Sequence, residues 1–213
     1  MSPRLIYVMD PMCSWCWGFA PVIEQIQELA PDLPVHLVAG GLRPGRGETL
    51  NDSARAALAE HWQAVAAVSG QPFATPDDLP TGFRYNTEPV CRALIVGREL
   101  DIDRLWSLIS LIQSAFYTQA ADVGLVPILM DLAEQAGYDR KAFCQAYDAE
   151  MTRAALAADI SWTRDLGIAG FPTLLAQRDG ALALLTNGYQ AADAVLPLFE
   201  RWLAAGRDTA NAC

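Results

Sequence analysis

The sequence lacks the basic surface that would suit a nucleic acid or an anionic membrane. Of its 213 residues, 15 are lysine or arginine and 25 are aspartate or glutamate, so the formal net charge at neutral pH is −10. Basic residues form no run anywhere in the chain. Such a surface repels the phosphates of nucleic acids and of anionic lipids. We therefore expect neither a nucleic acid nor a membrane as a partner.

Long apolar runs are also absent. The apolar stretch at residues 5–9 has only five residues and ends in Asp10-Pro11, which is too short for the core of a secretory signal. The stretch at residues 105–115 is interrupted by polar residues, well before the about 20 residues that cross a bilayer. We expect a soluble protein of the cytoplasm.

Histidine is scarce, and only one pair of cysteines is closely spaced. His36 and His61 stand alone, and a single Cys-x-x-Cys pair occurs at Cys13 and Cys16. A structural zinc site takes four ligands, usually from a second such pair or from clustered histidines. We therefore expect no metal and no other cofactor. The odd total of five cysteines also argues against a secreted domain held together by disulfides.

What the sequence does contain is enough apolar surface for a sizeable core. Apolar residues make up 52% and charged residues 19% of the chain, which is typical of a globular protein. A length of 213 residues is large for one compact domain and small for two. One domain with a substantial insertion fits best.

The N-terminal region has the pattern of a βαβ unit. Residues 5–9 and 35–39 are short runs rich in β-branched residues, which predict buried strands. Between them, apolar residues recur at helical spacing over residues 13–29, with Pro21 expected to kink the helix. Strand, helix and strand in this order predict a parallel pair with a right-handed crossover.

The C-terminal region has the pattern of a ββα unit. Strands are predicted at residues 173–176 and 182–185, joined by the turn signal Asp179-Gly180. A helix follows over residues 193–205, and Pro197 fits it only in the first turn. Residues 206–213 are expected to fray.

The region between these units is helical. Five helices are predicted, with Thr87 as the cap of the second and a bend in the last: residues 54–68, 89–98, 102–117, 127–137 and 139–166. The fold class is therefore α/β, a thioredoxin fold (βαβ…ββα) interrupted by a helical insertion domain. We expect residues 1–50 and 165–213 to form the thioredoxin-like domain and residues 51–164 the insertion.

The strongest chemical signal is the dithiol at the start of the first helix. Cys13 follows the first strand, where the unpaired N–H groups of a helix start favour an anion. Such a position, in a Cys-x-x-Cys motif, lowers a cysteine pKa from ~8.5 to roughly 3.5–7.5. Cys13 is thus the predicted nucleophile, and Cys16, one turn later, is placed to resolve a mixed disulfide. Ser14 and Trp15 lie between them and are expected to tune the thiolate and contact the substrate.

A second signal lies in the segment from Gly167 to Leu174. Pro172 stands directly before a predicted strand, where a residue without an N–H is tolerated. Gly170 nearby indicates a tight turn.

Together these motifs resemble the DsbA family of thioredoxin-fold proteins. The resemblance rests on the Cys-x-x-Cys pair after the first strand, Phe171-Pro172-Thr173 at the third, and the helix start at residues 86–93. Asp10–Phe19 is most similar to the cytosolic FrnE-like branch. The resemblance implies that the Phe171-Pro172 bond is cis and lies beside the dithiol. It also implies that the Phe171 backbone pairs with an extended substrate, as an added strand would.

The family implies a thiol-disulfide oxidoreductase, acting here as a protein disulfide reductase or isomerase. The substrate would be a disulfide-containing protein or a small thiol, glutathione among them. The sequence departs from secreted members because it has no export signal and has Ser14-Trp15 where those have Pro-His. We therefore expect a couple less oxidising than that of DsbA, which is about −120 mV.

Two other functions are also compatible with this layout. Kappa-class glutathione transferases and hydroxychromene-carboxylate isomerases resemble this layout but use a serine to activate glutathione, so a glutathione-dependent isomerase or transferase is the alternative. A non-catalytic binding module is the third. Cys16 favours the redox function, because a transferase has no need of a resolving thiol.

The remaining residues near the motif have open or ordinary interpretations. Phe19 is expected in the core, whereas Trp17 fits either the core or an apolar rim that Trp15 would share. Asp10 fits either a turn or a place near the sulfurs. We expect Cys91 and Cys144 to be buried, inert thiols and Cys213 to be a mobile free thiol. His36 and His61 are expected to pack within the structure rather than to take part in catalysis.

Overall fold

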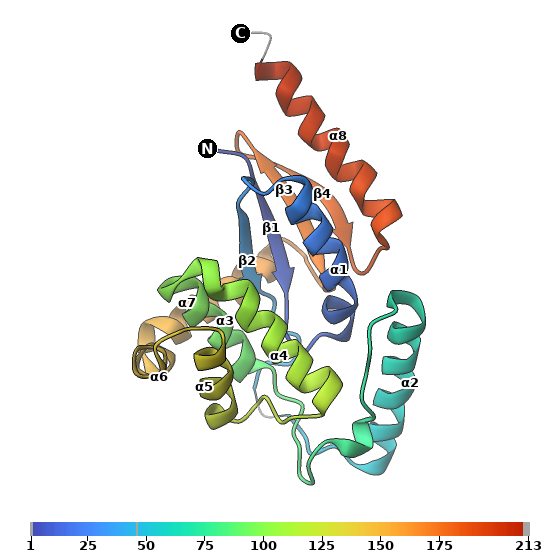
Figure 1. Cartoon of the computed structure of the whole chain (residues 1–213), viewed down its shortest axis with the longest axis vertical. Coiled ribbons are helices and arrows are strands. Elements are labelled where there is room, and N and C mark those ends of the chain that lie inside the picture. The colour runs from blue at the N-terminus through green and yellow to red at the C-terminus, as the bar shows by residue number, and fades with distance from the viewer. Residues whose placement is uncertain (1, 46, 211–213) are drawn as a thin grey trace.

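Four short strands form one mixed sheet, shown in Figure 1. The computed structural model describes residues 2–45 and 47–210. The strand order is β2-β1-β3-β4, with β1 and β2 parallel and the other pairs antiparallel. The strands are β1 (Arg4–Met9), β2 (Val35–Ala39), β3 (Thr173–Arg178) and β4 (Ala181–Asn187). All four predicted strands are confirmed.

The β3–β4 hairpin turns as its sequence predicts. Asp179 and Gly180 both have positive φ, 49° and 81°, as the two central residues of a type I′ turn require. Further along, the register shifts between Leu174 and Leu175, which leaves Leu185 as an extra residue in β4. Such a bulge increases the local twist of the hairpin.

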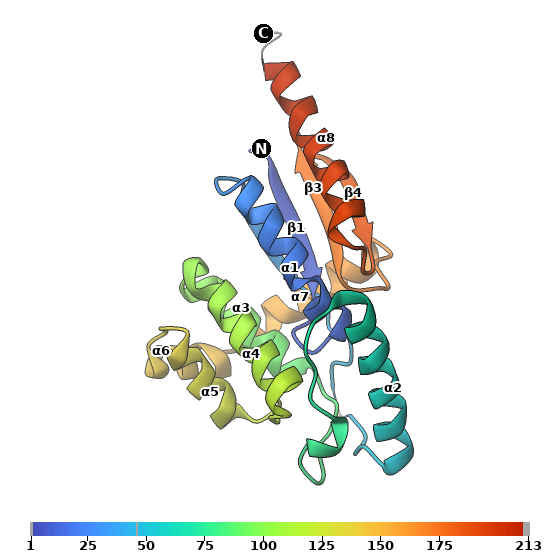
Figure 2. The same ribbon diagram turned by 45° about the vertical axis from the view of Figure 1, so that its right-hand side comes forward.

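The two faces of β1 pack against different helices. Leu5, Tyr7 and Met9 share a core cluster with α1 (Ser14–Leu29) and α8 (Ala192–Ala210), which lie together on that face in Figures 1 and 2. Ile6 and Val8 point the other way and form a smaller cluster beside the end of α7. This is the two-residue alternation expected of a strand buried on both faces.

Helices occupy the chain between β2 and β3. They are α2 (Asp52–Ser69), α3 (Glu88–Leu100), α4 (Leu105–Gln119), α5 (Val126–Gln135), α6 (Arg140–Asp148) and α7 (Glu150–Asp165), with short 3-10 turns at Pro76–Asp78 and Ile102–Arg104. The predicted fold class, a thioredoxin fold interrupted by helices, is confirmed. The domain boundaries at residues 50/51 and 164/165 stay a prediction.

One predicted helix is in fact two. Residues 139–166 do not form a single bent helix, because Ala149 has an extended backbone (φ −66°, ψ 141°) that ends α6 and begins α7. The Thr152 hydroxyl donates to the Ala146 carbonyl at 2.6 Å. The same carbonyl also accepts from the Ala149 N–H at 3.2 Å, so a side chain of α7 adds a second donor at the end of α6, which stabilises the break.

Three helix-end predictions were also wrong. Pro197 lies beyond the first turn of α8, which begins at Ala192, and residues 206–210 are helical rather than frayed. Cys213 lies outside the described residues.

Thr87 does stand at the start of α3, but it makes no side-chain cap. Its hydroxyl accepts the Arg43 N–H at 3.1 Å instead. α1 continues past Pro21 without a break.

Side chains from the helical region close the outer edge of β2. The Leu37 carbonyl accepts from Arg98 Nη1 at 2.7 Å, and the Ala39 N–H donates to Asp159 Oδ2 at 2.9 Å. Arg98 and Asp159 pair with each other at 2.8 Å. An edge strand exposes unpaired backbone groups, and here α3 and α7 supply the missing partners. Among the residues that the structure describes, no helix has both the length and the apolar character that crossing a membrane requires.

Candidate active site

The dithiol lies at the junction of β1 and α1. Cys13 is the cap residue of α1, with an extended backbone (φ −84°, ψ 115°), and its carbonyl accepts from Cys16 N and Trp17 N at 2.9 and 3.0 Å. A turn closed by Cys13 N and the Asp10 carbonyl, 2.9 Å apart, brings the chain from the strand into the helix. The predicted position of Cys13 at a helix start is confirmed.

The two sulfurs differ in their access to solvent. Both cysteines are free thiols; Cys13 is 5% exposed and Cys16 is fully buried. Burial, with the neighbouring Cys13 sulfur as a second cause, raises the pKa of the Cys16 thiol well above its ordinary value. A buried, protonated Cys16 behind a slightly exposed Cys13 suits a pair in which Cys13 attacks first.

The Phe171 loop lies against the Cys13 sulfur. The Cys13 thiol donates to the Phe171 carbonyl across 3.6 Å, and the Phe171-Pro172 bond is cis, as the family resemblance implied. The Phe171 ring turns away and packs on Gly40, where an added Cβ would come within 2.3 Å of the ring. A side chain at Gly40 would therefore displace the loop. The backbone of Phe171, not its ring, faces the dithiol.

Asp10 both forms a turn and lies near the sulfurs, which are the two positions expected for it. Its carboxylate accepts from Met12 N at 2.8 Å, which makes the turn, and from Leu42 N at 2.7 Å. It also accepts from the Cys91 thiol at 3.3 Å. Burial raises the pKa of Asp10, although these hydrogen bonds act in the opposite direction. Asp10 thus joins the loop after β2 and the α3 thiol to the turn before Cys13.

The sequence interpretation missed His61. It was expected to be packed, but its side chain is exposed and its Nε2 lies 2.9 Å from the Ser14 hydroxyl. Its ring also meets the edge of Trp15, with centroids 6.0 Å apart. No spacing could have revealed this, because α2 is brought to the motif only by the tertiary fold. His61 is a functional candidate contributed by the helical region.

The aromatic residues of the motif divide between a rim and a core. Trp15 is half-buried and packs against Tyr189 at 5.3 Å, whereas Phe19 is fully buried, as expected. Trp17 packs inward, stacking on Tyr117 and donating from Nε1 to the Pro72 carbonyl at 3.0 Å. Of its two interpretations, the core is therefore the better one.

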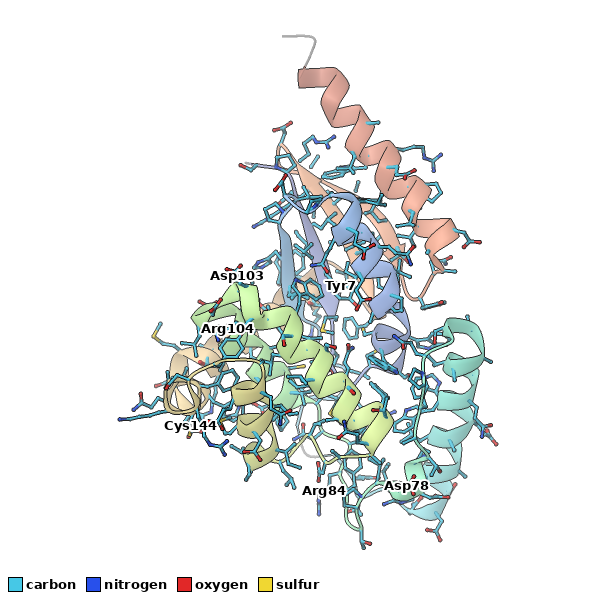
Figure 3. The ribbon with its side chains drawn as sticks, in the orientation of Figure 1. Tyr7, Asp78, Arg84, Asp103, Arg104 and Cys144 are labelled. Atoms are coloured by element: carbon cyan, nitrogen blue, oxygen red, sulfur yellow. The ribbon has the colours of Figure 1, made fainter. Side chains whose placement is uncertain are left out.

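Buried phenols surround the rear of the dithiol. Tyr7 lies inside the molecule (Figure 3), and burial, followed by the nearby Cys16 and Cys13, raises its pKa. Burial likewise raises the pKa of Tyr85, whose hydroxyl donates to the Met12 carbonyl. These side chains stay neutral and enclose the sulfurs in a medium of low polarity.

The other cysteines and His36 lie in different surroundings. Cys91 is buried, as expected, but Cys144 is exposed on the helical region (Figure 3), so the expectation of burial was wrong there. The reason is that α6 has a narrow apolar face, with Phe143 and Tyr147 as its buried residues. His36 lies half-buried on β2. Within residues 2–45 and 47–210, no three potential ligands gather as a metal would need.

Comparison with known proteins identifies the family. The model of the DSBA-like thioredoxin domain matches residues 4–197, and the chain belongs to this family. The structure resembles that of a candidate protein disulfide isomerase from Nitrosomonas europaea, at a TM-score of 0.87 and 33% identity, over 96% of this chain and 99% of that one. It also resembles the cytosolic disulfide reductase DsbM from Pseudomonas aeruginosa, at a TM-score of 0.79 and 28% identity, over 95% and 99% of the two chains.

Another relative is described as an adapter protein rather than as an oxidoreductase. The chain is 25% identical to the ClpXP adapter protein SpxH of Halalkalibacterium halodurans over 183 residues, which cover 82% of this chain. The match spans 58% of the length of that relative. The family supports an oxidoreductase of the DsbA type, and the finer function is considered next.

Proposed function

We propose that this protein is a cytoplasmic thiol-disulfide oxidoreductase that reduces or isomerises disulfides in proteins. The observation that supports this most directly is the placement of Cys13 as the cap of α1 with Cys16 buried one turn later. The start of a helix, with its unpaired N–H groups, is a position that suits a nucleophilic sulfur. The slight exposure of Cys13 leaves it as the sulfur that a substrate reaches.

The reaction proceeds in two exchanges. The Cys13 thiolate attacks one sulfur of the substrate disulfide, that S–S bond breaks, and the other substrate sulfur leaves as a thiolate that takes up a proton. Cys16 then loses its proton and attacks the Cys13 sulfur of the mixed disulfide. The second substrate thiolate leaves, and a Cys13–Cys16 disulfide remains. Two molecules of a small thiol such as glutathione restore the dithiol and become a disulfide themselves.

The substrate-binding residues are proposed from their positions. The Phe171 carbonyl is 3.6 Å from the Cys13 sulfur, so an extended substrate backbone beside it would be held close to the nucleophile. Pro172 follows Phe171 directly and is the next proposed substrate-binding residue. Ser14 and Trp15 follow Cys13 directly, and Trp15 offers an apolar rim beside it.

The relatives support reduction as the direction of the reaction and glutathione as the thiol donor. DsbM is described as a cytosolic disulfide reductase and has also been solved with GSH, glutathione, in a structure 26% identical to this chain. We propose the same compartment and the same class of small thiol here. The alternative, a glutathione-dependent isomerase or transferase, would leave the buried Cys16 without a role, and so would a purely binding function like that of an adapter.

The test is reduction of a disulfide-bonded protein with glutathione as the donor. We expect turnover by the wild type, no turnover by Cys13→Ser, and accumulation of a mixed disulfide on Cys13 in Cys16→Ser. Cys144→Ser removes an exposed thiol away from the motif and is the matched control, which should behave as the wild type. Turnover that survives in Cys16→Ser would remove the two-cysteine mechanism, and no turnover in the wild type would favour an adapter.

A further inference from the structure

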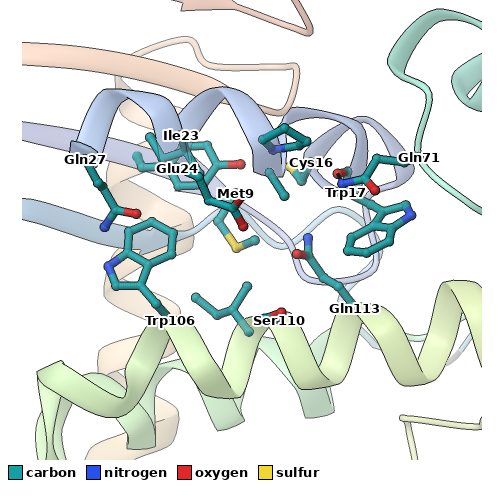
Figure 4. Close-up of a pocket in the computed structure, with 14 residues that line it drawn as sticks. Met9, Cys16, Trp17, Ile23, Glu24, Gln27, Gln71, Trp106, Ser110 and Gln113 are labelled. Atoms are coloured by element: carbon teal, nitrogen blue, oxygen red, sulfur yellow. Dashed lines mark hydrogen bonds between the residues drawn. The ribbon is translucent and has the colours of Figure 1, made fainter. Parts of the chain in front are cut away.

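A cavity of about 350 Å³ lies between α1 and α4, on the side of the dithiol away from Phe171. Figure 4 shows its floor at Met9 and its two ends at the rings of Trp17 and Trp106. Cys16 lines its inner wall, whereas Cys13 does not line it. The volume is at the lower end of the range for small-molecule sites, about 300–1,000 Å³. The cavity is therefore separate from the face on which Cys13 attacks.

The walls of this cavity are mainly apolar and aromatic. Apolar side chains come from β1, α1 and α4, among them Met9, Ile23 and Ile109. Trp106 itself stacks on Tyr7, with centroids 6.3 Å apart and an angle of 15° between the rings. Indoles at the two ends of an apolar space suit a flat aromatic molecule, because its edges can then meet an aromatic ring at each end.

One buried polar group in the cavity wall lacks a partner. Gln113 is 2% exposed, and its Nε2 has no hydrogen-bond partner among the described residues. Figure 4 shows this side chain reaching from α4 toward α1. A buried donor without an acceptor costs free energy, and the neighbouring Gln71 is already used, because it donates to the Trp17 carbonyl at 3.2 Å. The free Gln113 donor fits a ligand oxygen.

The charge of the side chains around the cavity limits the class of ligand further. Among the side chains that line the cavity, Glu24 is the one acidic residue, and no lysine or arginine is among them. The net charge of the chain is −10. Both facts disfavour an anion, so a dicarboxylate such as glutathione does not fit this place.

We propose that the α1–α4 cavity binds a small, neutral, flat aromatic compound with a carbonyl oxygen, held between Trp17 and Trp106 and hydrogen-bonded to Gln113. This site does not depend on the proposed redox function, because the attacking sulfur takes no part in it. It would nonetheless place a ligand directly behind Cys16.

The probes for this site are 2-naphthamide and 2-naphthoate, which share a shape but differ in charge, titrated by ligand-observed saturation-transfer NMR. The amide should bind saturably, and about tenfold more tightly than the carboxylate, because an anion would face Glu24 without a cation nearby. Gln113→Leu should weaken amide binding by roughly three- to tenfold, the usual worth of one hydrogen bond.

Further variants locate the site. Ser110 is exposed at the rim, so Ser110→Trp should block the cavity without disturbing the fold, and it serves if Gln113→Leu is unstable. Gln63→Leu, exposed on α2, is the control, and Cys13→Ser should bind as the wild type although it is redox-inactive. Equal affinity for the two probes, unchanged binding in Ser110→Trp, or no saturation up to about 2 mM would each overturn the proposal.

Discussion

At the scale of single residues, the site is a strand-to-helix turn held by hydrogen bonds of Asp10, Met12 and Cys13. Asp10 holds the backbone of Met12 and Leu42, and the Cys13 carbonyl begins α1. Besides the neighbouring Cys16 thiol, the Cys13 sulfur has a long contact with the Phe171 carbonyl. A rigid turn that leaves its nucleophile weakly held suits a sulfur that must exchange partners.

His61 should assist Cys13 through its contact with Ser14. Ser14 directly follows Cys13, so the imidazole sits close to the helix start where the thiolate charge develops. Its removal in His61→Ala should slow alkylation of Cys13 at neutral pH by roughly two- to fivefold, the scale of one weak charge contact at a helix terminus, and should make the couple more reducing.

Two variants refine this prediction. His61→Gln keeps a hydrogen-bonding side chain and should retain more of the rate if the contact with Ser14 matters. Gln63→Ala, exposed on the same helix, should leave the rate unchanged. Wild-type alkylation and reduction potential in His61→Ala would mean that His61 merely covers the surface.

Asp10 should give the protein a distinctive dependence of stability on pH. Burial raises the pKa of Asp10 in the folded state, so folding binds a proton more tightly. The stability from this proton is fully present below the unfolded pKa of ~3.9 and is lost as pH rises through the raised folded value. Asp10→Asn cannot titrate, and it offers one oxygen to two N–H donors.

Urea unfolding of the two proteins between pH 4.5 and 8, with steps of about half a unit, checks this. Asp10→Asn should be less stable by about 1–3 kcal/mol for the lost acceptor, and the advantage of the wild type should shrink as pH rises. An advantage that grows with pH would show that the carboxylate prefers its charged form in the fold.

At the scale of elements, the position of α2 against α1 determines whether His61 reaches the motif. Gly18 lies at the crossing, where an added Cβ would be 3.0 Å from the Ser69 Cβ and 3.2 Å from the Val65 Cγ1. The loop after α2 is fastened as well, because Trp17 Nε1 donates to the Pro72 carbonyl and Gln71 Nε2 donates to the Trp17 carbonyl across the same seam. The helical region is thus packed directly on the first turns of α1.

Gly18→Val should separate these two helices. Overpacking of this kind costs about 1–3 kcal/mol of unfolding free energy, and it should reproduce the slower alkylation of Cys13 expected for His61→Ala. Ala64→Val adds a similar side chain on the exposed face of α2 and should change neither. Thermal or urea unfolding and alkylation rates measure both effects. Full wild-type reactivity in a destabilised Gly18→Val would show that α2 supports the fold alone.

At the scale of the whole molecule, one buried ion pair connects the helical region to the sheet. Arg98 on α3 and Asp159 on α7 each bond the outer edge of β2 as well as one another. Their side chains are 10% and 13% exposed. Removing one partner leaves a poorly hydrated charge and one unpaired backbone group of β2, either the Leu37 carbonyl or the Ala39 N–H.

Arg98→Met should therefore lower the unfolding free energy by about 3–5 kcal/mol, and the double variant Arg98→Met with Asp159→Leu should cost less than the sum of the single changes. Arg140→Met breaks an exposed pair with Asp131 and should change stability little. Denaturant unfolding of the wild type, Arg98→Met, Asp159→Leu, their double variant and Arg140→Met provides the comparison. Additive effects, or a loss no larger than that of Arg140→Met, would contradict a structural role for this pair.

The sequence by itself determined the elements and the chemistry of this protein. Local rules placed the strands, the turn at Asp179-Gly180 and Cys13 at a helix start, because short-range periodicity and turn residues encode them. Tertiary structure decided what distant segments do to one another. It brought His61 to Ser14, Cys91 to Asp10, and opened a cavity beside Cys16, while it left Cys144 exposed. These outcomes depend on how helices far apart in the chain pack, and no local pattern records that packing.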